Sequence, residues 1–341
     1  MVSRELLEVV RCPTCGDEGF LRPEEAALRC TRCGTAYPRR PGYLDLMPRQ
    51  EGFAPTSRYV AEEEEFASAL DYRTVGPPLL AAGVRQRLLR GMLSLRPADR
   101  VLDCGCGNGK FSLWNREQVA FMAGLDPATL FADAAVERVD LVQGDARCMP
   151  FGSASFDKAF SFDVFEHLTR DDLEAVLAEL RRVLRPGGRL LVYSNTREPS
   201  RLQPLVNASR RLGAALRRRG LAAPERDALR KADHVKAIAT FEELATLVQG
   251  HGFRIVRVRF WNSVITSFIE HVLVPLVLTP HPRPPKAARE RGEGYARWRA
   301  RASQRGLFYR AGRALTWIMG LDVALFGRLR SGSYFLLLER S

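Results

Sequence analysis

Apolar and polar positions along the middle of the chain predict strands and helices in alternation. Residues 101–102, 120–125, 139–142 and 156–162 are short runs rich in apolar side chains, which is typical of strands buried in a sheet. Residues 79–95 instead predict a helix with one apolar stripe, formed by Leu80, Val84, Leu88, Met92 and Leu95. This alternation favours an α/β fold.

Two further strands are predicted near the C-terminus. Apolar and basic residues alternate over 252–260, and residues 333–340 are mainly apolar, as expected for a final antiparallel strand. About 70 residues separate the two segments. They contain an apolar stretch at 264–279, followed by aromatic residues interleaved with arginines. We therefore expect a helical insertion over residues 263–330.

A glycine-rich turn follows the first predicted strand. Residues 103–109 read DCGCGNG, and Gly105, Gly107 and Gly109 permit a tight turn in which the backbone closely approaches a ligand. A helix that begins at Lys110 would direct its N-terminus at that ligand.

This turn does not fit a dinucleotide. The dinucleotide pattern needs a glycine at position 110, where a lysine stands, and the carboxylate of Asp103 would repel a pyrophosphate. A ligand that carries an ammonium and a sulfonium would instead be attracted. In these residues the sequence resembles the class I S-adenosylmethionine-dependent methyltransferases, of the methyltransferase domain 11 type that acts on small molecules and lipids. The first motif of that family reads D-x-G-x-G-x-G.

Later segments match the same family in the same order. Asp126-Pro127 ends the second strand, Gly144-Asp145-Ala146 follows the third, and LRPGG at residues 184–188 precedes the fifth. The resemblance implies a Rossmann-like, doubly wound α/β sheet of seven strands, with S-adenosylmethionine as the cofactor. The residues that it implies as cofactor contacts are Asp103, Gly105, Cys106, Gly107, Asn108, Asp126, Pro127, Asp145, Ala146 and Phe162.

The resemblance also implies roles for some of these residues. Asp126 would accept hydrogen bonds from both ribose hydroxyls, although an aspartate before Pro127 can also cap a helix. Asp145 would bind the adenine amino group, and the backbone of Ala146 would donate a hydrogen bond. Phe162 could pack on the adenine ring.

Residues after the fourth strand carry the candidate catalytic groups. Glu166 and His167 match the EHL sequence of many small-molecule methyltransferases, which suggests His167 as a general base or as a hydrogen-bonding group beneath the cofactor. Together with Asp163, they are also similar to the divalent-metal site of ubiquinone-pathway O-methyltransferases, although Asp163 replaces a glutamate. His234 lies shortly before a predicted helix and is a second candidate on the substrate side.

The N-terminal segment, residues 1–48, carries two C-x-x-C pairs, Cys12 with Cys15 and Cys30 with Cys33. Four cysteines form a closed tetrahedral site for a structural Zn²⁺, whereas two disulfides are rare in cytosolic proteins. With its following YP…G strand, the segment resembles the Trm112-type zinc ribbon, whose members are partner subunits of methyltransferases. The alternative is the RNA-contacting zinc finger of certain ribosomal RNA guanine methyltransferases.

Length and composition allow two or three structural units, because the chain has 341 residues and 46% of them are hydrophobic. We expect the zinc ribbon at 1–48, a linker and N-terminal helices at 49–96, a methyltransferase core at 97–262 plus 331–341, and the insertion at 263–330.

The net charge of +13 indicates an anionic partner. No apolar run reaches the roughly 18 residues of a membrane span, and the start does not resemble a signal peptide, so we expect a cytoplasmic protein. Apolar residues interleaved with arginines in the insertion predict peripheral contact with the inner face of the membrane. A lid over the site or a dimer contact are alternatives.

The sequence therefore predicts a methyltransferase that acts on an oxygen or carbon of a small-molecule or lipid-linked acceptor. This acceptor class is favoured because the Asn-Pro-Pro-Tyr-like tetrad of amino-directed enzymes does not follow the fourth strand. An alternative is a ribosomal or transfer RNA base methyltransferase that holds RNA through the ribbon and the arginines. It ranks second because the insertion is too apolar for a phosphate-tracking surface. A non-catalytic scaffold that keeps the cofactor fold is the third hypothesis.

Overall fold

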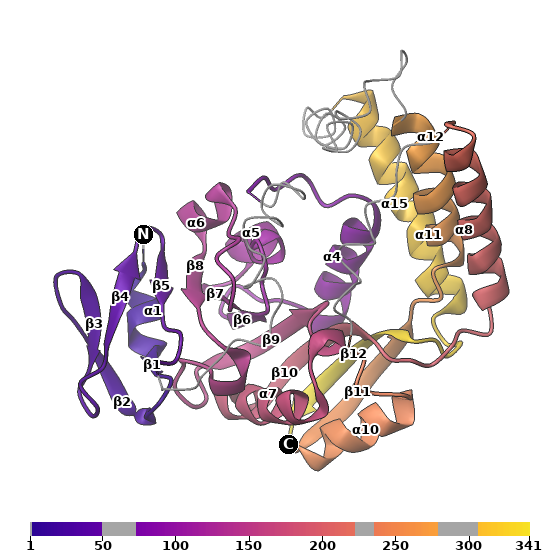
Figure 1. Ribbon diagram of the computed structural model, residues 1–341. Coiled ribbons are helices and arrows are strands. Elements are labelled where there is room, and N and C mark those ends of the chain that lie inside the picture. Colours follow the sequence, from indigo (N-terminus) through magenta and orange to yellow (C-terminus); the bar gives the residue numbers. More distant parts are fainter. Residues whose placement is uncertain (1, 50–72, 222–234, 279–305) are drawn as a thin grey trace.

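The structure is a computed structural model that describes residues 2–49, 73–221, 235–278 and 306–341. Within these residues, one continuous sheet of 12 strands runs through the molecule in the order β1-β2-β3-β4-β5-β8-β7-β6-β9-β10-β12-β11 (Figure 1). We expected a separate sheet of seven strands. The larger count arises because the N-terminal strands continue the sheet beyond β8.

The central strands form a mostly parallel sheet. They are β6 (Arg100–Cys104), β7 (Phe121–Asp126), β8 (Asp140–Gln143), β9 (Phe156–Phe162), β10 (Leu184–Asn195), β11 (Phe253–Phe260) and β12 (Ser333–Arg340). Strand β12 runs antiparallel to both of its neighbours, β10 and β11. Strands β6, β7, β8 and β9 pair in parallel, so the loops that follow them all begin at one edge.

Helices cover both faces of the sheet and bury two separate apolar cores. Helix α4 (Leu80–Leu93) agrees with the helix predicted over 79–95. It packs on one face together with α5 (Lys110–Asn115). Helices α7 (Arg170–Val183) and α10 (Phe241–Gly250) pack on the other face. The Thr169 side chain caps α7 by accepting a hydrogen bond from the backbone N–H of Asp172 at 3.2 Å. The short helix α6 (Asp133–Arg138) precedes β8.

The N-terminal segment is joined to the edge of this sheet. It comprises α1 (Arg4–Val9), β1 (Arg11–Cys12), β2 (Gly16–Pro23), β3 (Ala27–Cys30), β4 (Ala36–Arg40) and β5 (Tyr43–Asp45). Strand β5 pairs antiparallel with β4 and parallel with β8. Leu44 and Leu46 are fully buried in the core that also contains α7 and α10. The segment therefore shares an apolar core with the rest of the chain.

The insertion is helical where the structure describes it. Helix α11 (Val264–Phe268), a π-helical turn (Ile269–Leu273) and α12 (Val274–Leu278) lie between α8 (Gln203–Arg218) and α15 (Leu307–Phe326) in Figure 1. Helix α15 also packs on α4, where the Thr316 hydroxyl accepts a hydrogen bond from Leu80 N at 2.7 Å. Across the described ranges, no helix is long and apolar enough to cross a membrane.

Candidate functional site

The glycine turn after β6 has the backbone geometry that its sequence requires. Gly105, Gly107 and Gly109 have φ angles of +78°, +54° and +76°, which lie in the left-handed region that favours glycine. A Cβ on Gly105 would lie 2.2 Å from a methyl group of Val164, whereas a Cβ on Gly107 would meet open space. The turn therefore presents bare backbone at Gly107, where a ligand can approach closely.

Asp126, at the end of β7, holds this turn in place. Its carboxylate accepts hydrogen bonds from the backbone N–H of Gly107 at 2.7 Å and of Ala128 at 3.0 Å. No helix begins at Pro127, since the next helix in this described stretch, α6, starts at Asp133. The helix-cap interpretation of Asp126 is therefore wrong, because the side chain caps a turn instead.

Asp103 is the second carboxylate of the turn and is almost fully buried, with 2% of its surface exposed. Its carboxylate accepts a hydrogen bond from the Ser112 hydroxyl at 2.6 Å. Burial raises the pKa of Asp103 to about 7, although the bond from Ser112 lowers it. A cationic ligand beside this carboxylate would favour its ionised form.

Three other predicted cofactor residues shape the backbone around the turn. Cys106 is buried, and its sulfur packs where a Cβ on Gly124 would lie. The carbonyl oxygen of Asn108 accepts a hydrogen bond from Ala132 N at 3.1 Å, and that of Pro127 accepts one from Gln143 Nε2 at 3.3 Å. The two carbonyl groups and the Cys106 sulfur therefore hold the loops beside the turn.

Asp145 and Phe162 are already engaged within the protein. Arg147 forms a two-pronged ion pair with Asp145, with N–O distances of 2.8 and 2.9 Å, and also contacts Asp172 at 3.0 Å. The Phe162 ring is buried in edge-on contact with the rings of Phe111 and Tyr193. Ala146 starts the short helical turn that Asp145 caps. The adenine contacts implied for Asp145, Ala146 and Phe162 stay predictions.

Glu166 occupies a buried position between the ends of β9 and β10. It is 2% exposed, and its carboxylate accepts hydrogen bonds from the Ser194 hydroxyl and from Asn195 Nδ2, the latter at 3.1 Å. Burial and the nearby charge of Asp163 raise its pKa. This placement suits a residue that positions the loop after β9. His167 is half-buried in the same short turn, and His234 lies outside the described residues.

Arg85 lies beside the candidate site, and the sequence pattern does not reveal this position, because the apolar stripe of its helix indicates only core packing. Its guanidinium forms an ion pair with Asp163 and lies 5.1 Å from the centre of the Tyr193 ring. Asp163 follows β9 with a φ of +59°, a left-handed conformation that aspartate adopts more readily than most residues other than glycine. The pair stands at the carboxyl edge of β9, close to Glu166.

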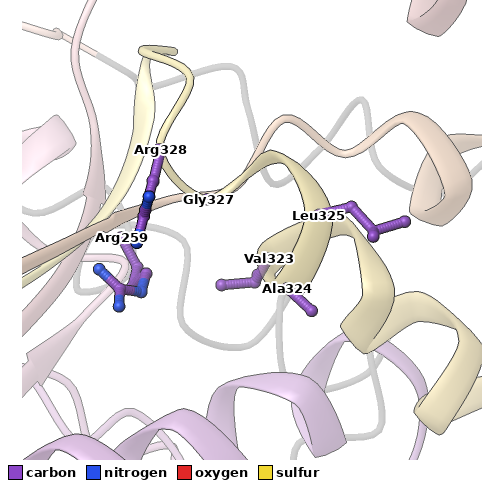
Figure 2. Close-up of a pocket in the computed structure, with 6 residues that line it drawn as sticks. All are labelled: Arg259, Val323, Ala324, Leu325, Gly327 and Arg328. Atoms are coloured by element: carbon purple, nitrogen blue, oxygen red, sulfur yellow. The ribbon is translucent and has the colours of Figure 1, made fainter.

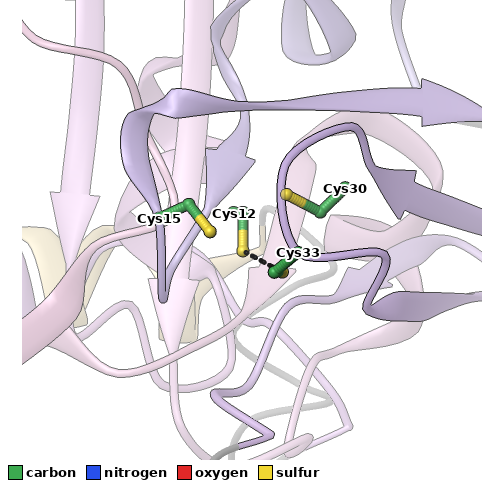
Figure 3. A group of neighbouring side chains, drawn as sticks. All are labelled: Cys12, Cys15, Cys30 and Cys33. Atoms are coloured by element: carbon green, nitrogen blue, oxygen red, sulfur yellow. Dashed lines mark hydrogen bonds between the residues drawn. The ribbon is translucent and has the colours of Figure 1, made fainter.

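The four N-terminal cysteines converge, as Figure 3 shows. Their Sγ atoms all lie within 4.8 Å of one another, and a tetrahedral zinc site with Zn–S bonds of about 2.3 Å needs sulfurs about 3.8 Å apart. The Cys12 and Cys33 sulfurs are 3.8 Å apart. A Cβ on Gly19 would lie 2.6 Å from the Cβ atoms of Cys12 and Cys15, so only glycine leaves room for this arrangement. The donor set fits a closed Zn²⁺ site.

Comparison with known proteins agrees with this geometry. Residues 102–192 match the family model of a methyltransferase domain. Malonyl-[acyl-carrier protein] O-methyltransferase of Serratia marcescens is 39% identical over 132 residues, which cover 38% of this chain and 50% of that protein. The tRNA (carboxymethyluridine(34)-5-O)-methyltransferase of Xenopus tropicalis is 36% identical over 104 residues, which cover 30% of this chain and 16% of that protein.

A solved structure shares the fold. Haemonchus contortus phosphoethanolamine N-methyltransferase 2, in complex with S-adenosyl-L-methionine, superimposes with a TM-score of 0.50 at 13% identity, over 86% of this chain and 61% of that one. The predicted Rossmann-like α/β fold is thereby confirmed. The chain matches half or less of the length of the two curated relatives. Together the comparisons support a class I S-adenosylmethionine-dependent methyltransferase domain.

Proposed function

We propose that this chain transfers a methyl group from S-adenosylmethionine to an oxygen or carbon of a small-molecule or lipid-linked acceptor. The observation that carries the proposal is the glycine turn at the carboxyl edge of the sheet. It presents open backbone at Gly107, is held by Asp126 and is backed by the buried carboxylate of Asp103. The region around it is the one that matches methyltransferases.

The residues of the turn have distinct proposed roles in binding. S-adenosylmethionine, when bound, supplies an electrophilic methyl group on a sulfonium. The carboxylate of Asp103 would attract the positive charges of this ligand. Asp126, which accepts hydrogen bonds from the backbone N–H groups of Gly107 and Ala128, would also accept from the ribose hydroxyls. The protein's contribution is mainly to hold the two reactants in line.

The acceptor would lie near the loop after β9. His167 and His234 are the proposed general bases for an acceptor oxygen. Glu166 is proposed as a positioning residue, because its carboxylate is buried and joined to Ser194 and Asn195. The Arg85–Asp163 ion pair, with the Asp163 side chain 43% exposed, would orient a polar group of the acceptor.

The four cysteines are proposed to hold a structural Zn²⁺ in a Trm112-like ribbon. The sulfur spacing and the room left by Gly19 support this assignment. Four protein ligands leave no open coordination position, so the metal would stabilise the segment that carries β5 and take no part in methyl transfer.

The acceptor is proposed to be a membrane-associated molecule. Helix α15 exposes Trp317 and Leu325, and α8 exposes Leu205 and Leu212. Arginines such as Arg210 accompany these apolar side chains on α8. Apolar side chains beside arginines suit an interfacial surface that faces anionic lipid.

A radiolabel transfer assay tests the proposal. The purified chain is incubated with methyl-tritiated S-adenosylmethionine and, in separate arms, a lipid extract, a small-molecule extract and total RNA. We expect label in the lipid or small-molecule arm, and we expect Asp126→Ala to reduce it strongly when the cofactor is below saturation. Cofactor binding without label in any arm would instead support the scaffold hypothesis.

RNA methylation is the second candidate, because one curated relative is a tRNA methyltransferase and the chain carries a net charge of +13. Label confined to the RNA arm would favour it. RNA affinity that falls steeply with salt would be the accompanying observation, since released counterions drive phosphate binding.

A further inference from the structure

A concavity of about 310 Å³ lies between the end of strand β11 and the C-terminal turn of helix α15 (Figure 2). Arg259 and Arg328 line one side, and Val323, Ala324 and Leu325 of the last helical turn line the other. The backbone N–H of Phe260 donates to the carbonyl of Gly327 at 2.9 Å, which ties the helix end to the strand.

Gly327 brings the helix end close enough to form this concavity. A Cβ at that position would lie 2.2 Å from the carbonyl oxygen of Val323 and 3.2 Å from Cδ of Arg259. The first contact rules out a side chain at the helix end, and the second shows that the aliphatic part of Arg259 passes close beside it. Arg259 and Arg328 thus line the same side of the concavity.

The concavity concentrates positive charge that the described residues do not neutralise. Neither Arg259 nor Arg328 has a carboxylate partner among them. Arg257 lies two positions before Arg259 on β11, so its side chain is on the same face of the strand. Burial and the positive charges of Arg257 and Arg328 lower the pKa of Arg259. A bound anion would relieve this repulsion.

Helix α15 also carries an exposed apolar stripe, whose C-terminal end adjoins the concavity. Exposed apolar residues recur along one side of the helix, and Arg310 and Arg313 are exposed among them. The apolar members are Leu307, Ala311, Ala314, Trp317, Ile318, Ala324 and Leu325. Leu325 is 66% exposed and also lines the concavity. The helix has 20 residues, so the stripe extends for about 30 Å. The two arginines of the concavity, which could bind a phosphate, therefore lie next to an apolar surface that suits acyl chains.

The concavity lies at the sheet edge that carries the candidate site. Strand β11 is antiparallel to β12, which is antiparallel to β10, so β11 ends at the same edge as β10 and β9. Three strand spacings separate β11 from β9, a distance of about 14 Å across the sheet. A lipid bound there would lie beside the loop that carries Asp163 and Glu166.

We propose that Arg259 and Arg328 bind the phosphate of an anionic glycerophospholipid, with its acyl chains against the exposed stripe of α15. The site would dock this edge of the sheet on an anionic bilayer. The inference deepens the membrane part of the proposed function and does not depend on methyl transfer. Its ligand chemistry is a phosphate, which a lipid or a free phosphate compound could supply.

Vesicle flotation with the full chain tests the proposal. The vesicles are phosphatidylcholine alone and phosphatidylcholine mixed with phosphatidate or phosphatidylglycerol. The test variant is Arg259→Gln with Arg328→Gln. The matched control is Arg22→Gln with Arg39→Gln, which removes the same charge from exposed positions on the N-terminal ribbon. A second variant, Leu325→Ser, tests the apolar stripe while leaving both arginines in place.

We expect binding to the anionic vesicles, and we expect the test variant to weaken it about thirtyfold, since each arginine near an anionic surface contributes about 1 kcal/mol. The control pair should weaken binding less than the test pair, and Leu325→Ser should weaken it measurably. Equal losses in the test and control pairs would overturn the proposal, because general charge would then explain binding.

Two further arms separate the sources of phosphate and the class of partner. Thermal shifts are measured with inorganic phosphate and with glycerol 3-phosphate. Stabilisation by these compounds without vesicle binding would overturn the lipid assignment. The lipid assignment would also be overturned if RNA displaces the chain from vesicles and if RNA binding requires the same two arginines. Affinity for S-adenosylmethionine is measured on every variant, so failure of the lipid site and failure of the proposed methyl transfer can be told apart.

Discussion

The carboxylate of Asp126 accepts a hydrogen bond of 2.7 Å from the backbone N–H of Gly107, which joins the end of β7 to the turn after β6. Gly107 has a φ of +54° and open space where a side chain would stand. The aspartate therefore fixes the one part of the turn that is bare toward a ligand. Loss of this carboxylate would affect the shape of the turn and, with it, the proposed contact with a ribose.

Asp126→Ala should weaken the affinity for S-adenosylmethionine at least tenfold. A hydrogen bond to a charged group contributes about 1.5–3 kcal/mol, which corresponds to roughly ten- to hundredfold in affinity. Isothermal titration calorimetry measures the change. Asp133→Ala, at the start of α6, is a control that should leave affinity unchanged. Equal affinity in Asp126→Ala and the native chain would contradict the assignment.

The buried carboxylate of Asp103 should make stability depend on pH. Its folded-state pKa is raised to about 7, whereas an unfolded aspartate titrates near 4. Between these values the folded chain binds more protons than the unfolded chain, so the free energy of unfolding should fall as pH rises, by up to about 1.4 kcal/mol per unit. Urea unfolding of the cofactor-free chain across this pH range measures the slope, which Asp103→Asn should reduce.

Cofactor binding should show the opposite dependence. A cationic ligand favours the ionised form of Asp103, so the affinity for S-adenosylmethionine should rise with pH up to about 7 and then level off. Calorimetry in two buffers with different ionisation enthalpies would detect the proton released on binding below pH 7. No proton release in the native chain would remove Asp103 from the binding role.

Cys12→Ser should release zinc and destabilise the N-terminal segment. Cys12 is fully buried, and its sulfur lies 3.2 Å from the hydroxyl of Tyr37 in addition to the other cysteines. Metal analysis after dialysis should find close to one zinc ion in the native chain and almost none in the variant. Cys148→Ser, outside the cluster, should retain the metal. Affinity for S-adenosylmethionine should change little, because the glycine turn lies outside the ribbon.

Asp322→Ala should destabilise the helical insertion. Asp322 is fully buried, and its carboxylate accepts hydrogen bonds from the backbone N–H groups of Ile265 at 2.9 Å and Thr266 at 2.7 Å, at the start of α11. Removing it leaves these groups without acceptors and should lower the free energy of unfolding by about 2–4 kcal/mol. Asp322→Asn retains one acceptor oxygen and should cost less. A loss no larger than that of the exposed Asp171→Ala would contradict this role.

Local patterns in the sequence were enough to place the glycine turn and the strands before and after it. The strands predicted at 156–162 and 333–340 agree with β9 and β12, because alternating or continuous apolar runs report burial directly. The grouping of the four N-terminal cysteines could also be predicted, since each C-x-x-C pair is a local unit.

Contacts between distant segments depended on the tertiary structure. Arg85 and Asp163 are 78 positions apart, and the amphipathic pattern around Arg85 indicates packing without naming a partner. Pairing of β5 with β8 likewise leaves no local signal, because a parallel ladder is specified by two remote strands. Arg259 and Arg328 meet only because β11 and α15 pack against each other. The residues of a single turn can thus be predicted from a short stretch of sequence. Contacts between charged residues on different elements depend on how the whole fold packs.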